Sequence, residues 1–200
     1  MLTRLLAIAG ALCAWTGLGL QLYLIMTGEL GALGGLWRFF AFFTILTNII
    51  CAALLTQTAL SGAISEAGAR LRGAAAVYIV VVGMVYVTVL QATWNPQGLQ
   101  LIADRLLHYG TPILFVLFWL FCVPKAPLRW RDAFAWLIYP ALYLGYVLAR
   151  AQFDGFYPYF FINLPEIGWT QFAINAAGLL AAFFGLGLLL IALAKAIRRP

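Results

Sequence analysis

Long apolar runs are the feature of this sequence that most constrains its fold. Six of them follow one another, near residues 5–26, 37–60, 74–92, 106–123, 133–148 and 171–197. A helix needs roughly 20 apolar residues to cross the hydrocarbon core of a bilayer. Because unpaired backbone N–H and C=O groups are too costly in lipid, runs of this kind form helices. We therefore predict an all-α, polytopic membrane bundle of six transmembrane helices.

The composition favours a membrane protein over a soluble one. Of the 200 residues, 65% are hydrophobic and 9% are charged, whereas soluble domains have roughly 45–50% apolar and about 25% charged residues. The segments between the apolar runs are short and rich in turn-forming residues. The first run is longer than the roughly 7–15 apolar residues of a signal peptide, so we expect a retained helix. We predict a single transmembrane domain over residues 1–200.

The positions of the basic residues predict the orientation of the chain in the membrane. With six spans, three cations lie on one side, namely Arg38, Arg105 and Arg150. Nine lie on the other side: Arg4, Arg70, Arg72, Lys125, Arg129, Arg131, Lys195, Arg198 and Arg199. Lys and Arg are enriched in cytoplasmic loops, so we place both termini in the cytoplasm. The net charge of +6 is thereby attributed to topology, and no nucleic-acid partner is expected.

The cysteines give no sign of a metal centre or of a disulfide framework. Cys13, Cys51 and Cys122 lie in apolar stretches without a C-x-x-C or Cys/His ligand spacing. We interpret them as small buried hydrophobic residues and expect neither a metal nor an organic cofactor.

Polar residues at membrane depth are the best candidates for function, because an unpaired polar group is costly in lipid and so faces the bundle interior. Thr44, Thr47 and Asn48 are spaced i, i+3 and i+4 and share one helix face. With about 1.5 Å of rise per residue, Thr44 lies roughly 10 Å below Trp37 if residues 37–60 form one helix. The only histidine, His108, begins the fourth run at the same membrane face. The hydroxyls and the imidazole are therefore expected to lie near one another.

A hydroxyl beside a neutral imidazole is the minimal nucleophile and base pair for attack on a carbonyl. Asp104 precedes His108 by one helical turn and would hold the ring as the third member of such a system. Other roles remain open for these residues. Membrane-embedded Thr often bonds its own helix backbone, Asn often bridges helices, and Trp and Tyr often form an interfacial belt.

Three short stretches carry a resemblance to a known family. They are Gly34-Gly35-Leu36-Trp37-Arg38-Phe39, Leu106-Leu107-His108 with Pro112 following, and Tyr157-Pro158-Tyr159-Phe160-Phe161. In order and spacing they resemble the androgen-induced and androgen-dependent membrane hydrolases, and still more their bacterial six-helix relatives. The resemblance implies a multipass hydrolase with a threonine nucleophile and a histidine partner, acting on fatty acid esters of hydroxy fatty acids. It also implies a bacterial cytoplasmic membrane, with membrane lipids and a lipid ester as the partners.

The resemblance assigns roles to individual residues. His108 matches the family histidine, but an ungapped alignment from Trp37 places Ala41 at the nucleophile position. Thr44 lies one turn further on and matches the Phe-Thr-x-x-Thr/Ser-Asn stretch of the bacterial relatives, so we expect Thr44 to be the nucleophile. Beyond what the resemblance implies, we consider Thr47 as an alternate nucleophile, Asn48, Asp104 and Arg38 as supporting residues, and Trp37, Tyr157, Tyr159 and Asn163 in substrate binding. Asn48 and Arg38 are candidates either for donating to an oxyanion or for packing.

Two other functions remain open at this point. A non-catalytic lipid- or sterol-binding protein would use the same aromatic residues, and Ala41 favours it. A small transporter would use Pro112 and Pro140 to break helices, but charged residues deep in the spans are scarce. The hydrolase requires a Thr44 or Thr47 hydroxyl within hydrogen-bond reach of His108, beside a closed apolar cavity that opens to the outer leaflet. A continuous polar path through the bundle would instead favour transport.

Overall fold

The computed structural model describes residues 1–197, which form helices and no strand. Six helical segments are long and apolar enough to cross a membrane: Leu2–Met26, Phe43–Ser61, Glu66–Thr93, Gly98–Cys122, Asp132–Asp154 and Leu164–Ile197. The prediction of an all-α, six-span integral membrane protein is thus confirmed. The cytoplasmic location of the termini stays a prediction, and Arg198 and Arg199 lie outside the described residues.

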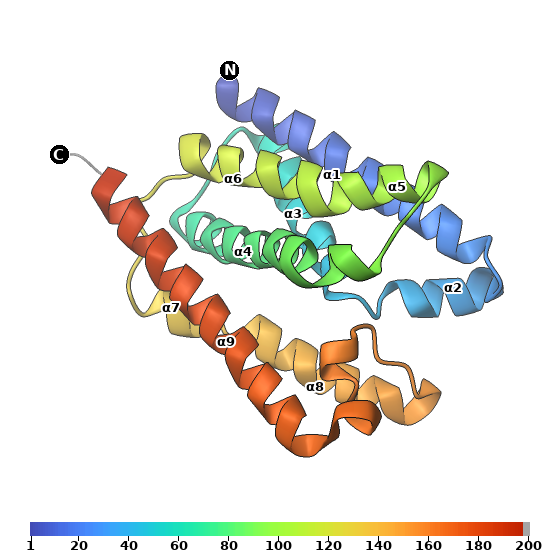
Figure 1. Ribbon diagram of the computed structural model, residues 1–200. Coiled ribbons are helices and arrows are strands. Elements are labelled where there is room, and N and C mark those ends of the chain that lie inside the picture. The colour runs from blue at the N-terminus through green and yellow to red at the C-terminus, as the bar shows by residue number, and fades with distance from the viewer. Residues whose placement is uncertain (198–200) are drawn as a thin grey trace. The chain divides into compact units, whose positions relative to one another are not determined.

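Backbone contacts divide the chain into two compact units, residues 1–128 and residues 129–200. The first unit contains α1 (Leu2–Met26), α2 (Gly31–Phe39), α3 (Phe43–Ser61), α4 (Glu66–Val85), the π-helix η1 (Tyr86–Leu90), the 3₁₀ turn η2 (Gln91–Thr93), α5 (Gly98–Arg105), the π-helix η3 (Leu106–Gly110) and α6 (Thr111–Cys122). Within it, α1 packs against α3, α5 and α6, and α4 packs against α3 and α6 (Figure 1). This unit holds the threonines, His108 and Asp104.

The prediction of one continuous helix over residues 37–60 is wrong, because the helix is interrupted at residues 40–42. Helix α2 ends at Phe39, Phe42 is extended with φ −88° and ψ 130°, and α3 begins at Phe43. The cause is tertiary: a Cβ atom on Gly35 would lie 2.4 Å from the carbonyl oxygen of Ile25, so α2 is fixed closely against the end of α1. Thr44 is therefore the second residue of α3 rather than two turns inside a helix that starts at Trp37.

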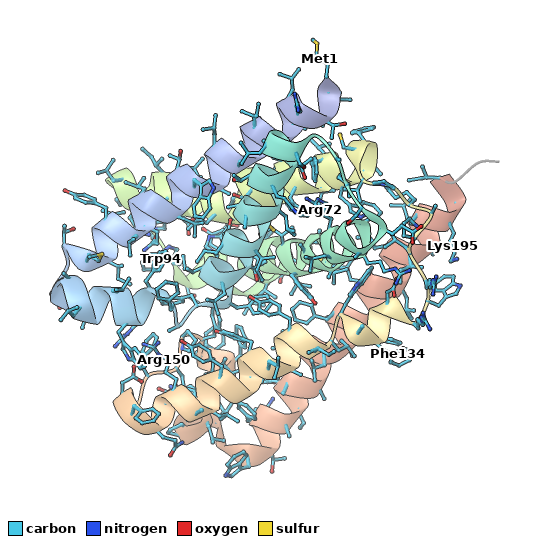
Figure 2. All side chains as sticks on the ribbon, turned by 180° about the vertical axis from the view of Figure 1, so that it is seen from behind. Met1, Arg72, Trp94, Phe134, Arg150 and Lys195 are labelled. Atoms are coloured by element: carbon cyan, nitrogen blue, oxygen red, sulfur yellow. The ribbon has the colours of Figure 1, made fainter. Side chains whose placement is uncertain are left out.

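The third and fourth spans begin earlier than predicted, at Glu66 rather than residue 74 and at Gly98 rather than residue 106. The apolar pattern missed these turns because they contain charged residues, which the tertiary structure accommodates. Arg72 is buried with 1% exposure (Figure 2). Its guanidinium donates to the carbonyl of Leu54 at 3.0 Å and to the hydroxyl of Thr58 at 2.7 Å, near the end of α3. Together with the side-chain oxygen of Gln57 at 3.1 Å, these neutral acceptors satisfy the buried cation.

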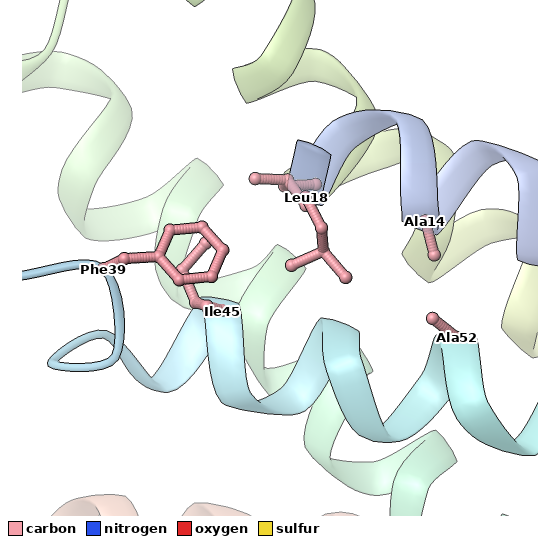
Figure 3. Packing of buried hydrophobic residues seen from close by; sticks show 6 residues of the cluster. Ala14, Leu18, Phe39, Ile45 and Ala52 are labelled. Carbon is pink, nitrogen blue, oxygen red and sulfur yellow. The ribbon is translucent and has the colours of Figure 1, made fainter. Parts of the chain in front are cut away.

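A small apolar cluster joins α1, α2, α3 and η3 next to the residues of interest (Figure 3). It consists of Ala14, Leu18, Phe39, Ile45, Ala52 and Leu107, all buried. Ile45 and Leu107 are the chain neighbours of Thr44 and His108, respectively. Packing of the cluster therefore fixes the first turn of α3 relative to η3.

The second unit contains α7 (Asp132–Ala135), α8 (Ile138–Asp154), the 3₁₀ turn η4 (Phe160–Ile162) and α9 (Leu164–Ile197). The predicted helices over 133–148 and 171–197 are too short, because helix continues to Asp154 and begins again at Leu164. Gly168, with φ 71°, interrupts α9 near its start, and the Asn175 amide donates to the carbonyl of Phe161 at 2.7 Å. The segment before the last span is thereby folded onto α9.

Candidate active site

Thr44 and His108 come from different helices of the first unit and meet side chain to side chain. The Thr44 hydroxyl oxygen lies 3.4 Å from Nε2 of His108. Thr44 is 9% exposed, and the His108 side chain is 14% exposed. The contact expected for a hydroxyl nucleophile and an imidazole base is therefore present in a site largely shielded from solvent.

The other ring nitrogen of His108 faces Asp104. Nδ1 lies 3.2 Å from Oδ1 of the Asp104 carboxylate and 3.1 Å from its backbone carbonyl oxygen. Both neighbours of Nδ1 are acceptors, so Nδ1 carries the proton when the ring is neutral. Nε2 is then the acceptor and takes a hydrogen bond from the Thr44 hydroxyl. Asp104 has the position of the acid in a Ser-His-Asp triad.

Tyr86 is a fourth member of this cluster, and sequence reasoning missed it. Its hydroxyl donates to Oδ2 of Asp104 at 2.5 Å, and its ring stacks on the imidazole of His108 with 4.1 Å between centroids and 16° between planes. Tyr86 is 3% exposed and Asp104 is 3% exposed. Because the carboxylate accepts from Tyr86 on one oxygen and from His108 on the other, it is held in one orientation. No local signal marks Tyr86, which lies in an apolar run of α4 and η1.

Both π-helices of the unit carry a residue of the site. Tyr86 begins η1, and His108 is the middle residue of η3. Pro112 follows η3 and has no N–H with which to bond the carbonyl of His108, so the regular ladder cannot continue there. Widened turns of this kind are frequent at functional sites. Here they bring the Tyr86 ring flat against the imidazole.

Asn48 links the helical segments that carry Thr44 and His108. Its amide nitrogen donates to the carbonyl of Thr44 at 2.8 Å and to the carbonyl of Leu107, next to His108, at 3.2 Å. Both N–H bonds are thus directed at backbone oxygens, and Asn48 is fully buried. In this structure the Asn48 amide therefore bridges α3 and η3, and its other candidate role, donation to an oxyanion, stays a prediction.

The other candidates of the first unit lie around α2 and α3. Thr47 is fully buried, and the hydroxyl found in contact with the imidazole is that of Thr44, which favours Thr44 over Thr47. Arg38 is half-buried and Trp37 is 49% exposed, both near the end of α2. Ala41, at 0% exposure, lies in the break between α2 and α3.

Tyr157, Tyr159 and Asn163 belong to the second unit and are half-buried there. The ring of Tyr159 stacks on Phe161 with 5.2 Å between centroids. The carbonyl of Asn163 accepts from the amides of Glu166 and Ile167 at the start of α9. Their predicted role in substrate binding stays a prediction. Among residues 1–197, no group of three or more His, Cys, Asp or Glu side chains is arranged to hold a metal ion.

The position of Tyr86 makes a testable prediction. In Tyr86→Phe the ring stack remains but the hydrogen bond to Asp104 is lost, so we expect kcat for an ester substrate to fall about tenfold with KM nearly unchanged. In the double variant with Asp104→Asn, the tyrosine change should cost little more, since its partner is already altered. Additive losses in the double variant would show that Tyr86 does not act through Asp104.

Comparison of the chain with models of known families, with curated proteins and with solved structures gave no match. The resemblance to the androgen-induced hydrolases therefore stays a prediction, and the case for a function depends on the geometry of the site.

Proposed function

We propose that this protein is an intramembrane lipid ester hydrolase, with Thr44 as nucleophile and His108 as general base. The observation that carries the proposal is the ordered series Thr44 hydroxyl, Nε2 of His108, Nδ1 of His108 and Asp104, with contacts of 3.4 Å and 3.2 Å. Nucleophile, base and orienting acid are the three parts that acyl transfer by a hydroxyl requires. The proposed substrates are fatty acid esters of hydroxy fatty acids or similar lipid esters.

Each step follows from the positions of these groups. Nε2 of His108 takes the Thr44 proton as the hydroxyl oxygen attacks the ester carbonyl carbon. The imidazolium then returns that proton to the leaving alcohol oxygen as its bond to the carbonyl carbon breaks, which leaves an acyl-threonine. Water, deprotonated by His108, attacks this ester and releases the fatty acid, and the proton passes back to the Thr44 oxygen. Asp104 stabilises the imidazolium in both halves of the reaction.

The start of α3 supports this chemistry electrostatically. Thr44 is in the first turn of α3, where the helix dipole is positive and favours negative charge. Negative charge develops on the threonine oxygen and on the carbonyl oxygen during attack. The effect is larger in a site of low exposure than in water.

The proposed location is a bacterial cytoplasmic membrane with both termini in the cytoplasm. With that orientation, the start of α3 lies near the outer face. A lipid ester then reaches Thr44 from the outer leaflet, with membrane lipids as the other partners.

A second candidate, a non-catalytic lipid-binding protein, is favoured by Ala41. This residue stands where an ungapped alignment of the resembling stretch places the nucleophile, and its methyl group supplies no reactive atom. In that case Thr44 and His108 would only hold α3 against η3.

The test is ester hydrolysis by the purified full chain in phosphatidylcholine nanodiscs, with an ester of a long-chain hydroxy fatty acid as substrate. Release of free fatty acid at a rate proportional to the amount of protein supports the hydrolase. Saturable binding of the ester without any release supports the second candidate.

A further inference from the structure

A small polar cavity lies next to the proposed active site within the first unit. Its volume is about 290 Å³. Its wall includes Tyr86, Gln91, Trp94, Asn95, Gln97 and Arg105. Tyr86 belongs to both sites, since its ring stacks on His108 and its hydroxyl donates to Asp104. The cavity thus borders the catalytic cluster.

The cavity lies at the level of lipid head groups. Residues 94–97 connect the spans Glu66–Thr93 and Gly98–Cys122, so this loop lies at a membrane face. Trp94 is 49% exposed there, as is common for interfacial tryptophan. Arg105 is seven residues into the span, roughly 10 Å from the loop at 1.5 Å per residue. The cavity therefore extends from the membrane surface toward the depth of the site.

Arg105 is the cation of this wall and has no anionic partner. Among residues 1–197 its guanidinium makes no hydrogen bond or ion pair, and it lies 5.0 Å from the centroid of the Tyr109 ring. Asp104 is its neighbour in sequence, but that carboxylate accepts from Tyr86 and faces His108. The guanidinium can therefore bind an oxyanion in a bidentate manner without breaking an existing pair.

The amides of the wall also present donors. Asn95 uses its oxygen to accept from Gln97, and Gln91 uses its oxygen to accept from the Tyr109 hydroxyl. The amide nitrogens of Asn95 and Gln91 are left to donate. No Asp or Glu lines the cavity. A wall of this kind is complementary to an anion.

We propose that this cavity binds the free carboxylate of the lipid ester, with Arg105 as its charged partner. The inference rests on the proposed hydrolase function and adds to it the residue that recognises the carboxylate of the hydroxy fatty acid part. The carboxylate lies at the interface beside Arg105, and the ester bond reaches Thr44 on the far side of Tyr86. Neutral esters of the same length lack this contact and bind more weakly.

Kinetics with matched substrates test the proposal. The two substrates are an ester of a hydroxy fatty acid with a free carboxylate and the same ester capped as its methyl ester. The wild type is expected to have about a tenfold lower KM for the free acid, the factor of one charge-assisted contact. Arg105→Gln should abolish this preference with kcat nearly unchanged. Arg131→Gln, which alters an exposed arginine outside the unit, should retain it. A preference that survives in Arg105→Gln overturns the proposal.

A binding measurement separates failure of the cavity from failure of the hydrolase. Tryptophan quenching by hexadecanoate brominated at carbon 2 reports on a carboxylate bound beside Trp94, and Trp94→Phe identifies the signal. We expect an apparent Kd about tenfold weaker in Arg105→Gln and unchanged in Arg131→Gln. If the wild type cleaves no ester but binds the bromo acid more tightly than Arg105→Gln does, the carboxylate site is supported and the hydrolase function is contradicted. An equal apparent Kd in the wild type, Arg105→Gln and Arg131→Gln overturns the proposed carboxylate site, whether or not esters are cleaved.

Discussion

Replacing His108 by alanine is expected to lower kcat for a lipid ester by about 10³-fold or more, because the base and the proton donor to the leaving alcohol are then both absent. Thr44→Ala should cause a loss of similar size, and the double variant should be no worse than either single one. Substitutions of residues that act together in one step have non-additive effects of this kind. Thr44→Ser keeps a hydroxyl at the same position and should retain measurable turnover.

Thr47→Ala is the matched control for these variants, since Thr47 lies one turn further along the same helix and is also buried. It should retain most of the activity. Thermal unfolding of each variant in the same nanodiscs must show that the fold is intact. Full activity of folded Thr44→Ala, or activity indifferent to His108, would contradict the assignment. Loss in Thr47→Ala alone would move the nucleophile to Thr47.

Asp104→Asn is also expected to lower kcat strongly, by about 10²- to 10⁴-fold, with little change in KM. The amide can donate to Nδ1 of His108, which favours the tautomer that carries its proton on Nε2. That nitrogen then faces the Thr44 oxygen as a donor and cannot accept its proton. Because the side chains have the same shape, substrate binding should persist, and nitrogen NMR of labelled histidine should report the changed tautomer.

The matched control is Asp154→Asn, an aspartate that pairs with Arg150 at 3.2 Å within the second unit. It should leave kcat for the ester within about twofold, since neither residue belongs to the proposed catalytic cluster. An Asp104→Asn variant that keeps the kcat of the wild type would show that the carboxylate does not orient the histidine during turnover. His108 would then act without a third member.

The number and type of the membrane spans follow from the sequence alone. Six apolar runs suffice because lipid permits only structures that satisfy their own backbone hydrogen bonds. The ends of the helices do not follow from the same pattern. Arg72 can be buried in α4 because neutral acceptors from α3 bond its guanidinium. Gly35 allows α2 to lie close against α1, and α3 then starts at Phe43 within a uniformly apolar stretch. Hydropathy cannot detect such a break.

Part of the candidate site was also predictable from the sequence. A histidine, an aspartate one turn before it and threonines at helical spacing are rare polar groups in an apolar chain, and their chemistry identifies them. Which threonine meets the histidine was decided by the tertiary structure, through the cluster that packs Ile45 against Leu107 and the bridge made by Asn48. Tyr86 and the cavity beside Arg105 depend on contacts between segments distant in sequence, for which local spacing carries no signal. The sequence determined which reactive side chains are available, and packing decided which of them lie within hydrogen-bond distance of one another.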